Sequence, residues 1–95
     1  WSLEICETDN DQLFSYLKST PDGSNVVMAV VNLDPHRMQH GLVRVPVADF
    51  GLDPDTAYVV HDLITDVRYT WRGEWNYVRL DPDALPVHLF RLETA

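Results

Sequence analysis

The sequence predicts an all-β protein that folds as an antiparallel two-sheet β-sandwich of about eight short strands. Three observations lead to this fold class. Gly, Pro, Asp and Asn recur about every ten residues, which is typical of turns between short strands. The segments between these turns are rich in Val, Leu, Tyr, Phe and Trp, which favour strands. No long segment has the apolar spacing of a helix, so no helix is expected to cover a sheet. The two sheets are therefore expected to bury their apolar faces against each other.

The first two expected strands form a hairpin. Leu3–Cys6 and Leu13–Ser19 flank a short polar group that suits the connection between them. The segment Thr20-Pro21-Asp22-Gly23 then predicts a turn, because Pro fixes its own φ and Gly accepts a positive φ without a steric penalty.

The third expected strand, Val26–Leu33, is an almost unbroken apolar run, VVMAVVNL, so we expect a central strand covered on both faces. It ends at Asp34-Pro35, where proline removes a backbone donor. The fourth strand is expected at Leu42–Val47. Because Pro46 cannot donate to a sheet, it indicates an edge position or a strand end.

Four more strands are expected in the second half of the chain. They are Tyr58–Ile64, Val67–Trp71, Trp75–Leu80 and Val87–Leu92, separated by turn residues at 65–66, 72–73 and 81–83. The order of the strands within the sheets cannot be read from this pattern.

A two-residue turn at Arg72-Gly73 would pair the two strands beside it as a hairpin and fix which side chains share a face. A three-residue loop would give two mixed faces, so the two-residue turn is the self-consistent choice. One face of the hairpin, expected to join the core, then carries Val67, Tyr69, Trp71, Val78 and Leu80. The other face carries Arg68, Thr70, Trp75, Tyr77 and Arg79.

The outward face is the candidate functional site. Trp75 and Tyr77, flanked by Arg68 and Arg79, could stack on a sugar ring while the guanidinium groups bond its hydroxyls. The same residue types are enriched at the centres of protein interfaces. Both interpretations stay open from the residues alone, and both leave Trp71 as a core residue.

Composition excludes several kinds of partner. The chain of 95 residues, 45% hydrophobic, is enough for a single domain, and its formal charge of −8 would repel nucleic acid and anionic membranes. No apolar run is long enough to span a bilayer, and no signal peptide is visible. The single cysteine, Cys6, is expected to be a packing residue at a strand end, and a small domain without disulfides predicts a reducing compartment, the cytoplasm.

No pattern in the sequence predicts catalysis, a cofactor or a metal. Nine aspartates lie at turn positions, where they bond their own backbone: Asp9, Asp11, Asp22, Asp34, Asp53, Asp55, Asp66, Asp81 and Asp83. His36 and His40 have a metal-binding spacing only if they lie on a helix, and they are expected in a loop. His61 and His88 are expected to be hydrogen-bonded structural residues within strands. There is no glycine-rich phosphate loop, Gly-x-Ser-x-Gly elbow or Cys-x-x-Cys motif.

Three stretches carry a family resemblance: TDNDQLFSYLK at 8–18, VVMAVVNLDPHRMQHGLVRVPVADFGL at 26–52 and VHDLITDVRYTWRGEWNYVRLDPDALPVHLFRL at 60–92. They resemble the C-terminal β-sandwich domain of the α-amylase superfamily, glycoside hydrolase family 13. The nearest branch is the GlgE type, maltosyltransferases that use maltose 1-phosphate to extend α-1,4-glucan, although trehalose synthases and amylases carry similar domains. Asp66 stands where the resemblance predicts glycine, and Leu17 where it predicts serine.

The resemblance implies that the catalytic carboxylates of the parent enzyme lie in an upstream (β/α)₈ barrel of about 250 residues, which cannot fit here. Residues 1–95, which begin with Trp1 rather than Met, are then expected to be a single C-terminal accessory domain cut from that enzyme. This domain would have no activity of its own and would pack on the barrel, whereas the parent would transfer maltosyl units with retention. The alternative is a carbohydrate-binding module for α-glucan that uses Trp75 and Tyr77.

Overall fold

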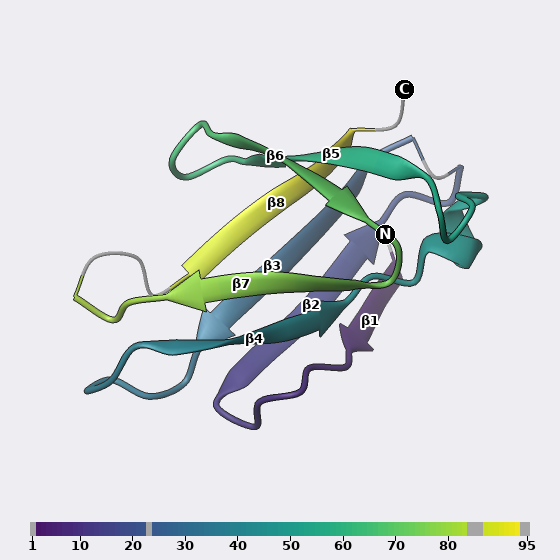
Figure 1. The fold of residues 1–95 in the computed structure, drawn as a ribbon. Helices are drawn as coiled ribbons and strands as arrows, with labels where there is room; N and C mark the ends of the chain where they lie inside the picture. The colour runs from purple at the N-terminus through teal and green to yellow at the C-terminus, as the bar shows by residue number, and fades with distance from the viewer. Residues whose placement is uncertain (1, 23, 84–86, 94–95) are drawn as a thin grey trace.

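Eight strands and one short 3-10 helix form the part of the chain that the computed structural model describes, residues 2–22, 24–83 and 87–93 (Figure 1). The elements are β1 Ser2–Cys6, β2 Leu13–Ser19, β3 Val26–Asn32, β4 Gln39–Arg44, η1 Val47–Phe50, β5 Ala57–Asp62, β6 Arg68–Arg72, β7 Trp75–Leu80 and β8 Val87–Glu93. The all-β class and the predicted strands are confirmed, with shifted ends. The largest shift is at β4, which begins three residues before the expected Leu42 and ends before Pro46. Gly23 of the first predicted turn lies outside the described residues.

The strands form two antiparallel sheets. The large sheet has the order β1-β2-β3-β8-β5-β6, and the small sheet pairs β4 with β7. Figure 1 shows β4 and β7 lying together on one side of the large sheet. The predicted first hairpin is confirmed, since β1 pairs with β2 from Ser2↔Ser19 to Cys6↔Ser15. The two-sheet sandwich is therefore the observed fold.

The predicted hairpin around Arg72-Gly73 is wrong. Trp71 on β6 pairs with Tyr58 on β5, whereas Asn76 on β7 pairs with Val43 on β4. The short connection thus carries the chain from one sheet to the other. The Tyr58 hydroxyl donates to the carbonyl oxygen of Gly73 at 2.8 Å, so a side chain from β5 holds this carbonyl. Gly73 has a φ of 72°, which a residue with a side chain rarely adopts.

The core lies between the two sheets. The large sheet contributes Leu17, Met28, Val30, Val60 and Phe90, and the small sheet and the segment after β4 contribute Val43, Val45, Val47 and Leu80, all at most 2% exposed. Trp71 is confirmed as a core residue, and its ring centroid lies 4.9 Å from that of Phe90. Val78 and Leu80 are also buried, as expected.

Two residues expected in the core are not buried. Tyr69 is 39% exposed and Val67 is 43% exposed. Both expectations came from the hairpin register, which would have placed β7 beside β6. In the structure β6 is an edge strand, and β7 diverges from it into the other sheet, so Tyr69 borders an opening instead of a packed interior.

Strand β3 lies at the centre of the large sheet, between β2 and β8, as predicted. Its inner side chains, such as Met28 and Val30, are buried against the core. The prediction that both faces are covered is wrong for the part of the chain that the structure describes. The other three elements, β4, β7 and η1, all contribute to the core between the sheets, and Val27 and Val31 point to the opposite face, where they stay partly exposed.

Cys6 lies at the end of β1, partly buried, and packs against the core, as expected. Burial, together with the negative charge of Glu4, raises the pKa of its thiol to about 11. Such a thiol is almost fully protonated near neutral pH and is a poor nucleophile. This agrees with a packing role.

Candidate functional site

Strand β7 carries three of the four predicted site residues on one face. Trp75 is 42% and Tyr77 57% exposed, and Arg79 is exposed beside them, whereas the alternating residues Asn76 and Val78 are buried. The period of two follows from strand geometry, since successive side chains point to opposite faces. The prediction that these three side chains point outward is confirmed.

Strand β4 completes this face. The register places Arg44 opposite Trp75, Leu42 opposite Tyr77, and His40 opposite Arg79. We call the six residues the outer strip. The rings of His40 and Tyr77 are 5.8 Å apart, and Arg44 is held by Glu74 at 3.4 Å. Sequence reasoning missed His40, Leu42 and Arg44, because it placed His40 in a loop and did not predict that β4 pairs with β7.

Arg68 does not belong to the outer strip. It lies on β6 in the large sheet, and its Nε bonds Glu93 on β8 at 3.1 Å. The prediction that two aromatic rings lie between two arginines depended on the hairpin register. Because that hairpin does not form, the prediction is wrong. The structure brings together Trp75, Tyr77 and Arg79, and leaves Arg68 elsewhere.

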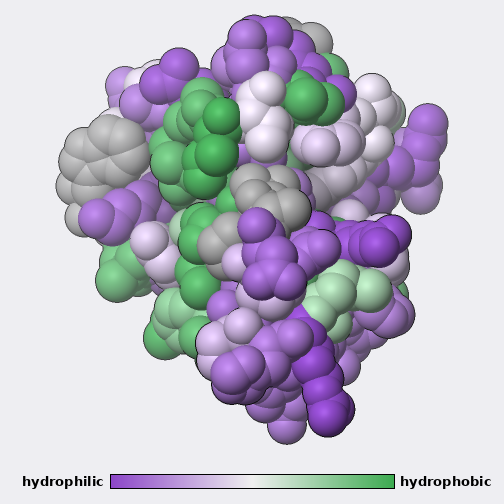
Figure 2. All heavy atoms as spheres, turned by 90° about the vertical axis from the view of Figure 1, so that its left-hand side faces the viewer, coloured by the Kyte–Doolittle hydropathy of each residue, from purple (hydrophilic) through white to green (hydrophobic). Residues whose placement is uncertain are grey.

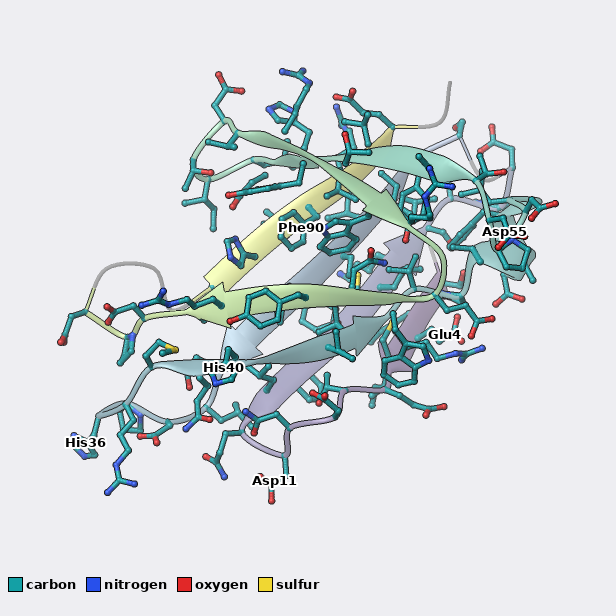
Figure 3. The ribbon with its side chains drawn as sticks, in the orientation of Figure 1. Glu4, Asp11, His36, His40, Asp55 and Phe90 are labelled. Atoms are coloured by element: carbon teal, nitrogen blue, oxygen red, sulfur yellow. The ribbon has the colours of Figure 1, made fainter. Side chains whose placement is uncertain are left out.

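A cleft of about 370 Å³ opens where β6 and β7 diverge. Figure 3 shows the labelled Phe90 between these two strands, with the labelled His40 on β4. The cleft is lined by Tyr69, Trp71, Tyr77, Val78, Arg79, His88 and Phe90. Because Tyr77 and Arg79 belong to both surfaces, the cleft and the outer strip are continuous. Of its rings, Tyr69 and Tyr77 are exposed and could contact a flat, partly apolar ligand, whereas Trp71 and Phe90 are core residues.

His88 lines the cleft and contacts a buried acid, Asp62. The Nδ1 of His88 lies 2.6 Å from the Oδ2 of Asp62, and its Nε2 lies 3.3 Å from the carbonyl oxygen of Arg79. Burial raises the pKa of Asp62, but the bonds from His88 and from the amides of Ile64 and Thr65 outweigh it, so the net pKa lies below its usual value. The contact of His88 with Asp62 joins neighbouring strands of the large sheet, and its contact with Arg79 on β7 reaches the small sheet. The structural role predicted for His88 is confirmed.

The remaining polar residues singled out in the sequence have local partners. His61 bonds Asp66 at 2.6 Å, in agreement with its predicted structural role. Asp34 accepts the amide of His36 at 2.9 Å, and Asp53 accepts that of Asp55 at 2.9 Å, which confirms turn roles for these carboxylates. Within residues 2–22, 24–83 and 87–93, no three His, Cys, Asp or Glu side chains gather as a metal site would require. The same residues include no helix with the length and apolar character needed to cross a bilayer.

Comparison with known proteins gives the chain a family. Residues 5–92 match the family model described as GLGE, C-terminal. The chain is 43% identical over 84 residues to the alpha-1,4-glucan:maltose-1-phosphate maltosyltransferase of Chlorobaculum tepidum, a match that covers 88% of this chain and 12% of that protein. It is 43% identical to the enzyme of that name from Salinibacter ruber and 39% identical to that from Picrophilus torridus, over 99% and 98% of this chain.

This similarity is confined to a small part of each relative. The chain spans 12% to 14% of the length of these three curated relatives. The match nevertheless runs from the end of β1 into β8, and it covers all of the strands between them. The chain therefore belongs to the GlgE C-terminal domain family.

Proposed function

We propose that residues 1–95 form a non-catalytic accessory domain that packs on the catalytic part of a larger enzyme and stabilises it. The observation that carries this proposal is the family match over the whole sandwich, combined with relatives about seven times longer that are named as maltosyltransferases. The parent enzyme, by this proposal, transfers maltosyl units from maltose 1-phosphate to α-1,4-glucan with retention, using residues outside this chain.

The outer strip is proposed as one contact with another part of the same polypeptide. Trp75 and Tyr77 are large aromatic side chains held rigidly on a strand, and a protein partner could bury them at little cost in side-chain entropy. Arg79 at the same face could pair with a carboxylate of the partner. Arg68 would take no part in this contact, because it is bound to Glu93 on the large sheet.

The alternative function, α-glucan binding, is supported by one observation, the cleft beside Tyr77. Its aromatic lining could stack on the apolar face of a glucose unit. Titration of maltooligosaccharides into the chain, followed by tryptophan fluorescence, separates the two functions. Wild type and Tyr77→Ala, which keeps every tryptophan, should both give a flat signal at millimolar sugar. A saturable change that disappears in Tyr77→Ala would favour glucan binding.

An activity assay tests the accessory role itself. With maltose 1-phosphate and an α-1,4-glucan, the 95-residue chain should release no phosphate, whereas the enzyme that contains it should. Deleting the domain from that enzyme should lower its melting temperature. Turnover by the isolated chain, or a deletion that leaves the melting temperature unchanged, would contradict the proposal.

The cytoplasm is the compartment that we propose for the parent enzyme. Support comes from the single cysteine, which rules out a disulfide within the chain, and from its weakly nucleophilic thiol.

A further inference from the structure

The two outermost strands of the large sheet, β1 and β6, each have one side that no described strand pairs with. They lie at opposite borders of that sheet in Figure 1. In β6 the amide of Arg72 donates to the side chain of Asn76, away from β5, whereas the carbonyl oxygen of Val67 accepts from β5. Because the direction of these groups alternates along a strand, the N–H and C=O groups of Arg68 and Thr70 point away from β5. The free side of β6 can therefore pair with another strand.

Strand β1 is exposed along most of its length. Leu3 is 63% and Ile5 70% exposed, and Glu4 between them is exposed as well. Glu4 lies opposite the core residue Leu17, so it points to the side of the small sheet, and Leu3 and Ile5 point to the other side. In Figure 2 hydrophobic residues gather mainly over the left half of the view, which is that other side of the large sheet. An exposed edge strand with large apolar side chains is a place where a further strand can add.

The strand directions let a second copy continue the large sheet. Every neighbouring pair among its six strands is antiparallel, so β1 and β6 run in opposite directions. A second copy added in the same orientation therefore places its β1 antiparallel to β6 of the first copy. The core sides of the two large sheets then face the same way.

Charge favours this pairing over the two symmetric ones. Pairing β1 with β1 would bring Glu4 beside Glu4 of the second copy, and pairing β6 with β6 would bring Arg68 beside Arg72. Like charges directly opposite each other on neighbouring strands are destabilising. Pairing β1 with β6 avoids both contacts, because it joins a strand that carries an acid to a strand that carries two bases.

Arg79 is the basic residue that Glu4 can reach in this arrangement. Tyr69 of β6 lines the cleft together with Arg79, and it lies on the core side of its strand, as Glu4 does on β1. A second copy's Glu4 placed opposite Tyr69 therefore points into the mouth of the cleft. Arg79 is exposed, and among the residues that the structure describes no carboxylate forms an ion pair with it. Its five N–H groups can serve one carboxylate here and another at the outer strip.

We propose that β1 of one copy adds to β6 of a second copy, with Glu4 opposite Tyr69 and its carboxylate bonded to Arg79. This self-association surface goes beyond the accessory role, and it uses the two borders of the large sheet. Leu3 and Ile5 become partly covered by the neighbouring strand. Because the two surfaces differ, the contact is head-to-tail, and it repeats as an open chain or closes as a ring.

Zero-length cross-linking of the enzyme that contains this chain tests the contact. In Arg79→Lys a carbodiimide can join the new amine to a carboxylate that touches it. A mixture of ¹⁵N-labelled and unlabelled enzyme should then give an amide between position 79 and Glu4 in linked peptides that carry both isotopes. Arg37→Lys, at an exposed turn, is the control and should give no link to Glu4. The absence of the first link, or a link that joins only peptides of the same isotope, overturns the inference.

Charge reversal in the same enzyme measures the contact independently. Glu4→Arg and Arg79→Glu should each weaken self-association about tenfold in sedimentation velocity, and the double variant should restore it. Asp11→Arg and Arg37→Glu change the net charge by the same amounts at exposed turns and should leave self-association unchanged.

Three results of the sedimentation experiment contradict the proposed contact. They are a wild-type sedimentation coefficient that does not vary with concentration, equal weakening by the two control variants, and a double variant no better than either single one. The domain deletion described above tests the accessory role separately, so the failure of this contact would leave that proposal standing.

Discussion

The side-chain nitrogen of Asn76 on β7 donates to the hydroxyl of Tyr58 on β5 at 3.0 Å, and this bond joins the two sheets at one corner. The Tyr58 hydroxyl in turn donates to the carbonyl oxygen of Gly73 at 2.8 Å. The Oδ1 of Asn76 accepts the amide of Arg72 at 3.1 Å. Burial raises the pKa of Tyr58 to about 12, so the hydroxyl keeps its proton and its role as a donor at physiological pH.

Removing the hydroxyl of Tyr58 should therefore destabilise the sandwich. In Tyr58→Phe the carbonyl of Gly73 and the amide of Asn76 each lose a partner, at a cost of about 1–3 kcal/mol. Urea denaturation of the chain measures this free energy of unfolding. Tyr77→Phe is the control, since Tyr77 is 57% exposed and its hydroxyl can bond water. Equal losses for the two variants would show that the corner contributes nothing specific.

Trp71 and Trp75 should differ sharply when truncated. Trp71 is only 7% exposed and packs on Phe90, so Trp71→Ala should cost roughly 3–5 kcal/mol in the free energy of unfolding. Trp75 is 42% exposed, and Trp75→Ala in the isolated chain should change stability by about 0.5 kcal/mol or less. Chemical denaturation checks both values. A large loss for Trp75→Ala would mean that the outer strip is part of the fold.

The Asp62–His88 pair should make stability depend on pH. Because the folded pKa of Asp62 is lowered, its carboxylate contributes stability above the unfolded pKa of about 3.9. That contribution is lost as the pH falls from about 4 through the lower folded pKa. We expect Asp62→Asn to cost about 1–3 kcal/mol at pH 7 and progressively less below pH 4.

Urea midpoints of wild type and variant between pH 7 and pH 2.5 test this dependence. Asp55→Asn is the control, because Asp55 is exposed at a turn and should show no such trend. A cost of Asp62→Asn that stays constant down to the lowest pH would refute the assignment.

Asp66 adopts a φ of 61°, in the left-handed region that glycine occupies freely. The resemblance to the family predicted glycine at this position, and the backbone gives the physical reason. Asp66→Gly should therefore be more stable than Asp66→Ala by about 1–2 kcal/mol, since both variants lose the bond to His61 and only alanine bears the steric cost. Thermal unfolding of the two variants provides the comparison. Equal melting temperatures would mean that the turn relaxes to another conformation.

Strand positions, the burial of Trp71 and the outward direction of Trp75 and Tyr77 could all be predicted from the sequence. Each depends on local information, namely turn residues and the period of two along a strand. Trp75 and Tyr77 point outward, as predicted, although the predicted partner strand was wrong. Successive side chains along β7 alternate between its two faces, and this alternation does not depend on which strand pairs with β7. The same local logic correctly placed Cys6 at the end of a strand.

The partners of β6 and β7 could not be predicted, and with them the place of Arg68 and the exposure of Tyr69. A two-residue turn between two apolar strands favours a hairpin on local grounds. Here Tyr58 and Asn76, far apart in the sequence, bind this turn from both sides and direct its two strands into different sheets. The contact of Tyr58 with Gly73 spans 15 positions of the sequence and leaves no signal in the turn itself.

The place of β8 in the large sheet has a consequence for synthesis. It pairs with β3 on one side and β5 on the other, although it follows all the other strands in the chain. Until residues 87–93 leave the ribosome, the large sheet consists of two separate groups of strands, β1–β3 and β5–β6, and lacks the strand that pairs with both. Folding of the sandwich must therefore wait for its last strand, and translation that stops before Val87 would yield a polypeptide prone to aggregation and degradation.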